Sequence, residues 1–166
     1  MEIVIDLLHL DKSIKELKAF EEDFDKKVMT TVEKAVSLGW SQAVANFKGA
    51  QYDGTNDVSV TARTKHKAGY IEASGKATLF IEFGTGVHYG NSHPNAYEFG
   101  YFPGSYGPNG LKEHWLYEGE PGTNGVPSTV NPKLVFTRGN PANRCMYNAG
   151  KAIETQIPKI VREVFK

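Results

Sequence analysis

The feature that most constrains the fold is an apolar pattern near the N-terminus that repeats every three or four residues. This spacing places the apolar side chains along one face of an α-helix. They are Ile14, Leu17, Phe20, Phe24, Val28, Val32, Ala35, Val36, Trp40, Ala43 and Phe47. The pattern predicts one long helix over residues 11–47. Asp11 or Ser13 is expected to cap its start, and a bend is expected at residues 37–39, which include a glycine.

After this helix the apolar period changes from three or four residues to two. Val58, Val60 and Ala62 alternate with polar residues, and so do the apolar residues of the segment 78–83. Alternation of this kind is typical of half-buried strands. A middle strand at residues 70–73, followed by a turn at residues 74–76, completes the pattern. The sequence therefore predicts an antiparallel β-meander over residues 57–83, packed on the long helix.

Residues 84–132 form a long segment of a different composition. It holds ten of the seventeen glycines and six of the eight prolines, which is too many for regular elements. It also carries eight aromatic residues, namely Tyr89, Tyr97, Phe99, Tyr101, Phe102, Tyr106, Trp115 and Tyr117. We expect an ordered loop, with a strand at residues 114–117, whose aromatic side chains bury surface against an assembly partner. The alternative is that these rings fold back onto the domain's own core.

The last part of the chain, residues 133–166, is predicted to form a strand and a C-terminal helix. The strand is expected at residues 133–137. Asn140 is a good N-cap and Pro141 suits the first helical position, where its missing N–H costs nothing. The apolar residues of the helix recur at helical spacing, and Pro158 is expected to kink it. The whole chain is thus interpreted as a single α+β domain, 1–166.

The sequence patterns also predict which side chains form the core. The expected core combines the long helix, the third strand of the meander and the C-terminal helix. Its members are Leu17, Phe24, Val28, Val32, Val36, Trp40, Leu79, Ile81, Phe83, Met146, Ala149, Ile153 and Ile157.

Composition excludes several classes of protein. Nineteen basic and nineteen acidic residues give a net charge of zero, so the positive field that attracts proteins to nucleic acid or anionic membranes is missing. The residues from 133 onward are nevertheless basic, with seven cationic and two acidic side chains. No apolar run reaches the length of a membrane span, and no signal peptide is visible, so the chain is expected to stay in the compartment where it is made.

Residues that could carry chemistry are few. His88, His93 and His114 could supply imidazoles to a metal, with Glu82, Glu98 or Glu113 completing the site. No helical pair of histidines with an intervening glutamate occurs, so we expect no metal here. Since the sequence shows no other active-site constellation, we also expect no cofactor and no enzyme activity.

Two further patterns argue against catalysis. Cys145, the single cysteine, is expected to be an inert thiol on the buried face of the last helix. Gly84 and Gly86 follow an apolar segment, but Tyr89 stands where a dinucleotide fingerprint needs its third glycine.

Two short motifs resemble those of a known family. The first is the segment 81–86, Ile-Glu-Phe-Gly-Thr-Gly, which contains Glu82, Phe83, Gly84, Thr85 and Gly86. The second is the segment 137–146, Thr-Arg-Gly-Asn-Pro-Ala-Asn-Arg-Cys-Met, which contains Gly139, Pro141 and Ala142. Together they resemble the neck, or head-tail joining, proteins of long-tailed bacteriophages, also described as minor tail or minor capsid components. The family commonly has Pro-Phe-Met where this chain has Arg-Cys-Met, and the loop of this chain is long.

The resemblance implies a structural protein of a virion or prophage. Such a protein is made in the cytoplasm of the bacterial host and acts at the neck or tail of the virion. Its expected partners are copies of itself in a ring, together with portal-side or head-closure proteins and tail proteins, without membrane or sequence-specific nucleic acid. A small metal-dependent hydrolase and a host-directed binding module remain as alternatives. The residues do not separate a neck protein from a tail terminator.

Overall fold

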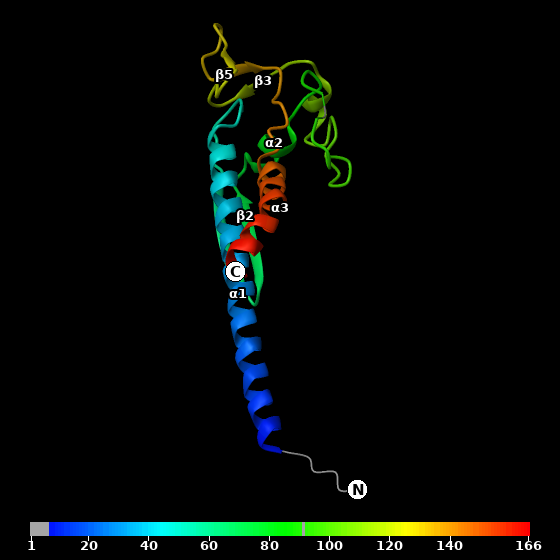
Figure 1. Cartoon of the computed structure of the whole chain (residues 1–166). Coiled ribbons are helices and arrows are strands. Elements are labelled where there is room, and N and C mark those ends of the chain that lie inside the picture. The colour runs from blue at the N-terminus through cyan, green and yellow to red at the C-terminus, as the bar shows by residue number, and fades with distance from the viewer. Residues whose placement is uncertain (1–6, 91) are drawn as a thin grey trace.

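The computed structural model describes residues 7–90 and 92–166, and it has an α+β fold. A single long helix, α1 (Leu7–Lys48), forms the axis of the molecule (Figure 1). A two-stranded hairpin and the C-terminal helix α3 (Cys145–Val164) lie along the C-terminal half of α1. A head of loops and short elements sits above them, while the N-terminal half of α1 projects away from the body. Within the described residues, no helix combines the length and apolar character needed to span a bilayer.

The long helix is confirmed, but its details differ from the expected ones. It begins at Leu7, so Asp11 and Ser13 lie inside it and do not cap it. It also runs without a break through residues 37–39, where we expected a bend. Gly39 has a packing role instead, because a Cβ there would lie 2.4 Å from Ile153 Cδ1 and 2.6 Å from Ile71 Cδ1. The glycine lets α3 and the hairpin approach α1 closely.

The hairpin consists of β1 (Ser59–Lys65) and β2 (Ala68–Ser74), paired antiparallel from Ser59 opposite Ser74 to Lys65 opposite Ala68. His66 and Lys67 form its two-residue turn, and both have positive φ angles, 49° and 63°. A two-residue turn with this backbone twist matches the twist of paired strands. Lys67 is further held by an ion pair with Asp25 of α1, at 2.6 Å.

The prediction of a third strand in the meander is wrong, because residues Thr78–Phe83 form a short helix, α2. Ile81 and Gly84 donate their backbone N–H groups to the carbonyls four residues before them. Asp57 holds the start of this helix by accepting the N–H groups of Lys76 and Ala77, both at 2.9 Å. These tertiary contacts override the two-residue alternation of the segment.

The start of the C-terminal helix is also corrected. The helix begins at Cys145, after Arg144 in a left-handed conformation with φ 56°, and not at Asn140 and Pro141. Asn140 pairs with the backbone of Thr85 instead, as an isolated β-bridge. The helix continues through Pro158 to Val164.

The head contains a small sheet of three strands in the order β3-β5-β4. They are β3 (Trp115–Glu118), β4 (Val126–Pro127) and β5 (Leu134–Thr137), all antiparallel. The strands expected near residues 114–117 and 133–137 are therefore confirmed. The loop between α2 and this sheet includes a single 3-10 turn, η1 (Pro108–Leu111).

The buried core lies where the upper end of α1 meets α2 and the start of α3. Its fully buried apolar side chains include Ala43, Phe47, Ala77, Ile81, Cys145 and Ala149. Ile81 and Ala149 were predicted correctly. Other predicted core residues are 41–67% exposed, namely Leu17, Phe24, Trp40, Leu79 and Ile157. The helical spacing identified the apolar face of α1 but not how far along it the body extends.

Candidate functional site

The two motif segments, 82–86 and 139–146, are joined directly in the structure. Thr85 donates its backbone N–H to the Asn140 carbonyl at 2.9 Å, and Asn140 returns a bond to the Thr85 carbonyl at 3.1 Å. The Asn140 side-chain amide adds a bond to the Thr85 hydroxyl at 3.0 Å. Residues that are 55 positions apart in the chain thus form one hydrogen-bonded unit, which we call the motif junction.

Glycines allow the backbones of the motif junction to approach each other closely. A Cβ at Gly139 would lie 2.2 Å from the Thr85 carbonyl oxygen, and one at Gly84 would lie 2.6 Å from the Ala142 nitrogen. Both distances are too short for any side chain. Gly84 and Gly139 also have φ angles of 77° and 88°, which favour glycine. Gly86 packs against the Trp115 ring, and a Cβ added at Gly86 would lie 3.0 Å from the Trp115 Cζ3 atom.

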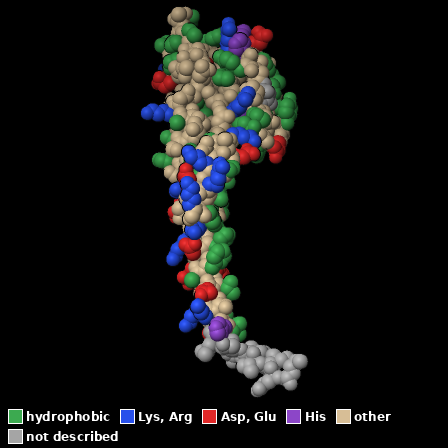
Figure 2. All heavy atoms as spheres, in the orientation of Figure 1, with side chains coloured by type: hydrophobic (Ala, Val, Ile, Leu, Met, Phe, Trp, Pro, Cys, Tyr) green, Lys and Arg blue, Asp and Glu red, His purple; other side chains and the backbone are tan. Residues whose placement is uncertain are grey.

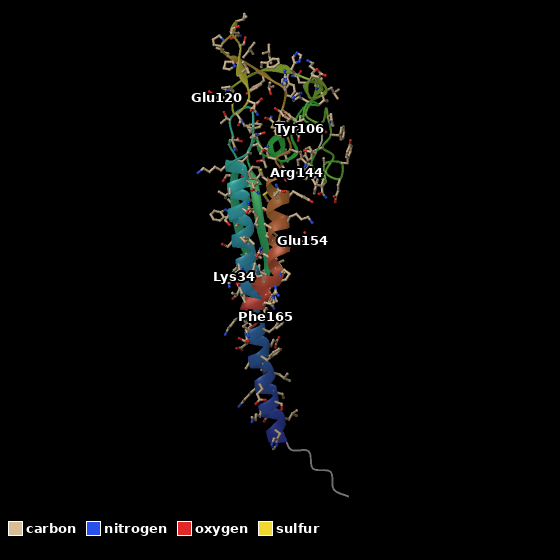
Figure 3. All side chains as sticks on the ribbon, turned by 45° about the horizontal axis from the view of Figure 1, so that its top comes forward. Lys34, Tyr106, Glu120, Arg144, Glu154 and Phe165 are labelled. Carbon is tan, nitrogen blue, oxygen red and sulfur yellow. The ribbon has the colours of Figure 1, made fainter. Side chains whose placement is uncertain are left out.

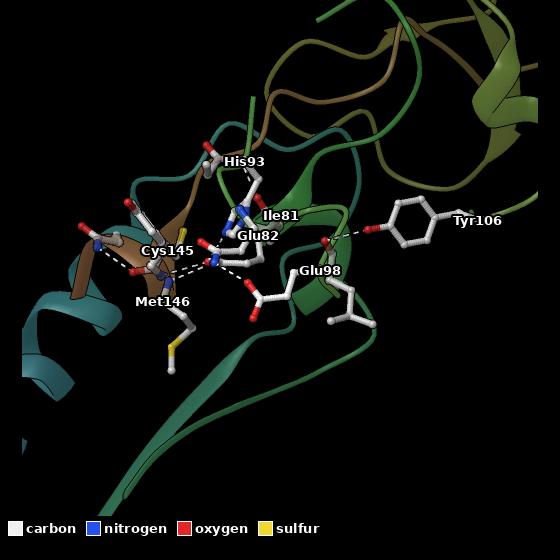
Figure 4. Close-up of polar contacts among 12 residues, drawn as sticks. Ile81, Glu82, His93, Glu98, Tyr106, Cys145 and Met146 are labelled. Atoms are coloured by element: carbon white, nitrogen blue, oxygen red, sulfur yellow. Dashed lines mark hydrogen bonds and ion pairs between the residues drawn. The ribbon is translucent and has the colours of Figure 1, made fainter. Parts of the chain in front are cut away.

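Glu82 caps the start of α3 from another part of the chain (Figure 4). Its Oε2 accepts the N–H of Met146 at 2.8 Å, and its Oε1 accepts the N–H of Tyr147 at 3.0 Å. These are first-turn amides of α3, which have no partner inside the helix. Arg144, at the cap position, supplies no side-chain bond of its own. The Glu82 carboxylate therefore provides acceptors for the free N–H groups at the start of α3. Its negative charge also interacts favourably with the positive end of the helix dipole.

A buried histidine completes this arrangement. His93 Nε2 lies 3.2 Å from Glu82 Oε1, and the two side chains are only 3% and 7% exposed. The other ring nitrogen, Nδ1, accepts the backbone N–H of Asn95 at 3.2 Å. Because Nδ1 accepts, the proton of the neutral ring lies on Nε2 and is donated to Glu82. The bond fixes the loop beginning at His93 to the α2–α3 corner.

A second buried carboxylate, Asp53, lies behind the motif junction. Its Oδ2 accepts the Thr137 hydroxyl at 2.6 Å, and its Oδ1 accepts the Asn124 N–H at 2.8 Å. The N–H of Asp53 is donated to the Asn140 side-chain oxygen at 2.6 Å. Asp53 thus connects the segment after α1, the head sheet and the motif junction. Burial, together with the nearby Asp53 charge, raises the pKa of Tyr117 to about 12.

An open apolar groove lies beside the Glu82–His93 pair. Its volume is about 650 Å³, and α2, α3 and the loop after His93 all contribute to its walls. The apolar side chains that line it include Leu79, Phe83, Phe99, Tyr101 and Met146. Lys151 and Glu154 stand on its α3 side and form an ion pair with each other at 2.7 Å. The groove can hold apolar side chains of a partner.

The eight loop aromatics divide into two groups. Tyr101 stacks on Phe83 with ring centroids 4.2 Å apart, and Tyr106 packs on Phe80 at 4.7 Å. The Tyr106 hydroxyl also donates to the Leu79 carbonyl (Figure 4). The rings of Trp115 and Tyr117 belong to β3 in the head. For Tyr101 and Tyr106 the structure thus shows the alternative arrangement, in which loop rings cover the domain's own core.

The remaining rings of the loop stay exposed to solvent. Tyr97 is 78% exposed, Phe99 61% and Phe102 52%, and Tyr89 is also exposed. We call Tyr97, Phe99 and Phe102 the exposed aromatic surface. Phe99 of this surface also lines the groove.

Of the candidate metal ligands, the structure brings His93 and Glu82 together, but no third candidate joins them within the described residues. His93 is bonded to Glu82, His88 packs on the Tyr89 ring at 4.8 Å, and His114 packs on Phe136 at 5.2 Å. In residues 7–90 and 92–166, no cluster of three or more His, Cys, Asp or Glu side chains has the arrangement of a metal site. Glu98 bonds to Asn95 at the surface.

Cys145 is fully buried, as the helical spacing predicted. Burial, and to a smaller extent the nearby Glu82 charge, raises the pKa of its thiol to about 12. A thiol in this state is a poor nucleophile at neutral pH.

Sequence reasoning missed three residues that build this region. Asp53 and Asp57 bind backbone or hydroxyl groups far away in the chain, and Asn143 bonds both to Gln51 and to the Ile81 carbonyl. Each lies in a short polar segment without apolar periodicity, so only its type, Asp or Asn, was a signal for backbone capping.

The fold therefore defines a small α+β protein with a long helical axis, a motif junction and an apolar groove. Comparison with known proteins adds no relative: no family model, no curated protein and no solved structure matches the chain significantly.

Proposed function

We propose that the protein is a structural component of a bacteriophage or prophage virion that joins head and tail. It acts at the neck, or completes the tail, by binding other proteins and not by catalysis. Its partners are copies of itself in a ring and the adjoining head-closure or portal-side and tail proteins. It is made in the bacterial cytoplasm and ends in the virion.

The observation that carries this proposal is the motif junction beside an exposed aromatic surface. The segments 82–86 and 139–146, which carry the resemblance to neck proteins, bind each other by the Thr85–Asn140 bridge and the Glu82 cap. Rigid placement of this corner holds the groove and the exposed aromatic surface in a fixed position. Aromatic side chains of this kind are enriched at protein interfaces and are costly to leave in water.

The same contacts support a role without catalysis. Both oxygens of Glu82 accept backbone N–H groups, and both ring nitrogens of His93 have partners within the chain. The pair is thus used to hold the α2–α3 corner together. Cys145 is buried and carries a raised pKa, so it does not supply a nucleophile to this pair.

The test replaces the exposed aromatic surface, in which Phe99 also contacts the Phe83 ring, with centroids 5.9 Å apart. A Tyr97→Ser/Phe99→Ser/Phe102→Ser variant is introduced into an inducible phage or prophage that depends on this gene. The matched control is Val130→Ser, because Val130 is 92% exposed and lies between β4 and β5, away from the groove. Both purified proteins should unfold cooperatively like the wild type, since the replaced side chains are at the surface.

After induction, the triple variant should accumulate filled heads and finished tails that are not joined, as counted by electron microscopy. The control should give normal virions. Normal joining by a correctly folded triple variant would contradict the proposal. If joined virions form but adsorb poorly to cells, the result would instead support the alternative function, a host-directed binding module.

A further inference from the structure

The projecting half of α1 carries an apolar face that nothing in the described chain covers. Figure 2 shows apolar side chains along one edge of this projection and charged side chains along the other. Leu17 and Phe20 are each 67% exposed, and Leu10, Ile14 and Phe24 are 41–52% exposed. We call these five residues the α1 stripe. Apolar exposure on this scale, arranged along one helix face, marks an interaction site.

The α1 stripe continues an interface that already exists within the chain. In its C-terminal half, α1 packs against α3 along the length of α3. This cover ends at Phe165, which follows α3 (Figure 3). Its ring contacts the Phe24 ring of α1, with centroids 5.6 Å apart. Below Phe24, no helix of the described chain lies beside this face. Most of the stability of helices in proteins comes from packing of an apolar face, so packing against another element would stabilise this part of α1.

We propose that a second copy of the chain covers the α1 stripe with its own α1 stripe, in antiparallel orientation. The uncovered face runs from Leu10 to Phe24, where Phe165 blocks further extension. A reversed copy centred near Leu17 has the same length and fills this space. Leu10 of one copy then lies near Phe24 of the other.

The charges on α1 favour the antiparallel direction. Residues 21–25 contain four carboxylates and no basic side chain, whereas residues 11–18 contain three lysines and two carboxylates. A parallel pair would align the two acidic segments with each other. The antiparallel pair instead places each acidic segment beside residues 9–13 of the other helix, whose one carboxylate, Asp11, is balanced by Lys12. It also places the two heads at opposite ends, so the α3 helices do not compete for the same space.

The buried area indicates how strong the contact is. Five large side chains per copy, each about half exposed, remove on the order of 1,000 Å² from water in the pair. This value is at the lower limit for a specific interface. The dimer should therefore form at high protein concentration and dissociate on dilution. The inference does not depend on the proposed function in the virion.

The first test measures association of the full chain by sedimentation over a wide concentration range. The wild type should shift from monomer to dimer as concentration rises. Leu17→Glu should remain monomeric at every concentration, because it buries a charge at the centre of the contact. Lys15→Ala changes the net charge by the same amount at an exposed lysine outside the α1 stripe, and should dimerise like the wild type. Unchanged helix content by circular dichroism shows that Leu17→Glu is folded.

The second test determines the direction with a short bismaleimide cross-linker. Leu17→Cys should cross-link to itself, because the two copies of residue 17 meet near the centre. Leu10→Cys should not, because the two copies of residue 10 lie about 20 Å apart along the helix axis. The wild type should not react, since Cys145 is fully buried.

Three outcomes would overturn the proposal. A wild type that stays monomeric at high concentration would show that the dimer does not form. A Leu17→Glu variant that still dimerises would show that the contact lies outside the α1 stripe. Cross-linking of Leu10→Cys as efficient as that of Leu17→Cys shows a parallel pair.

Discussion

At the scale of single residues, the Glu82 side chain joins α2 to the start of α3 and to the loop at His93. It accepts two backbone N–H groups at the start of α3 and bonds to His93, all within a buried corner. A carboxylate is well suited here because it has several acceptor sites and no donor. The charge is compensated by the helix dipole and the N–H groups, which is why it can be buried.

Replacing Glu82 with Gln should therefore lower the free energy of unfolding. The amide retains one oxygen and introduces a donor facing the Met146 or Tyr147 N–H, so we expect a loss of about 2 kcal/mol. Urea unfolding followed by circular dichroism measures it. Glu113→Gln is the matched control at an exposed position, and should change stability by no more than about 0.5 kcal/mol. Equal stability of the two variants would show that Glu82 does not hold α3.

The glycines of the motif junction give a second prediction. Gly139→Ala places a Cβ 2.2 Å from the Thr85 carbonyl in a backbone with φ 88°, so the Thr85–Asn140 bridge must open. We expect a loss of about 2 kcal/mol or more in unfolding free energy. Gly150→Ala is the control within α3, because no atom lies within 4 Å of its added Cβ. That variant should instead gain up to about 1 kcal/mol from helix propensity. A Gly139→Ala protein as stable as wild type would contradict the close approach.

At the scale of elements, the start of α3 shows how the tertiary structure moves a helix boundary. Asn140 and Pro141 have the right types for a helix start, yet Asn140 binds Thr85 and Asp53 instead. The helix then begins after Arg144, whose φ of 56° is unfavourable for any residue with a Cβ. This strain is offset by the Glu82 cap on the N–H groups of Met146 and Tyr147.

Arg144→Gly should relieve that strain. Glycine adopts a positive φ at little cost, so we expect a gain of about 0.5–1 kcal/mol in unfolding free energy. Arg144→Ala is the control, because it removes the same side chain and keeps the Cβ. Thermal and urea unfolding of both variants measure the difference. If the alanine variant gains as much as the glycine variant, the side chain and not the backbone is responsible.

At the scale of the whole molecule, a buried cysteine and two half-buried tyrosines connect stability to pH. Burial raises the pKa of Cys145 and of Tyr117 to about 12 each, and it also raises that of Tyr106. The native state therefore holds these protons more tightly than the unfolded chain, whose ordinary values are 9.0 and 10.0. The stabilising contribution is complete below about pH 9 and is lost as the pH rises toward 12.

The free energy of unfolding should accordingly fall from pH 9 to pH 11, as measured by urea titration at each pH. Tyr117→Phe should reduce this fall, because one of the titrating groups is removed. Tyr97→Phe is the control for the same chemical change on a ring that is 78% exposed, and it should leave the fall unchanged. An unfolding free energy that stays constant to pH 11 would contradict the burial of these groups.

The distribution of the core also appears only at this scale. Helical spacing correctly identifies one apolar face along α1, but Ala43 and Phe47 are buried while Leu17 and Phe20 are exposed. The difference comes from where α3 ends, and that is decided by packing. In the proposed dimer, the α1 stripe on the N-terminal part of this face would be covered by the α1 stripe of the second copy.

What the sequence determined by itself is local. The period of three and four residues specified α1 and α3, and the burial of Cys145, because periodicity directly reflects which face of a helix is apolar. The alternation after residue 57 specified the hairpin strands for the same reason. The α+β fold follows from these elements.

The tertiary structure decided the rest. Residues 78–83 have the alternation of a strand, yet Asp57 at one end and the α3 start at the other hold them as a helix. The motif junction depends on contacts between Thr85 and Asn140, and on Asp53, across 55 to 87 residues. Hydrogen bonds over such separations leave no periodic signal in the sequence, because their geometry exists only after the elements between them have packed.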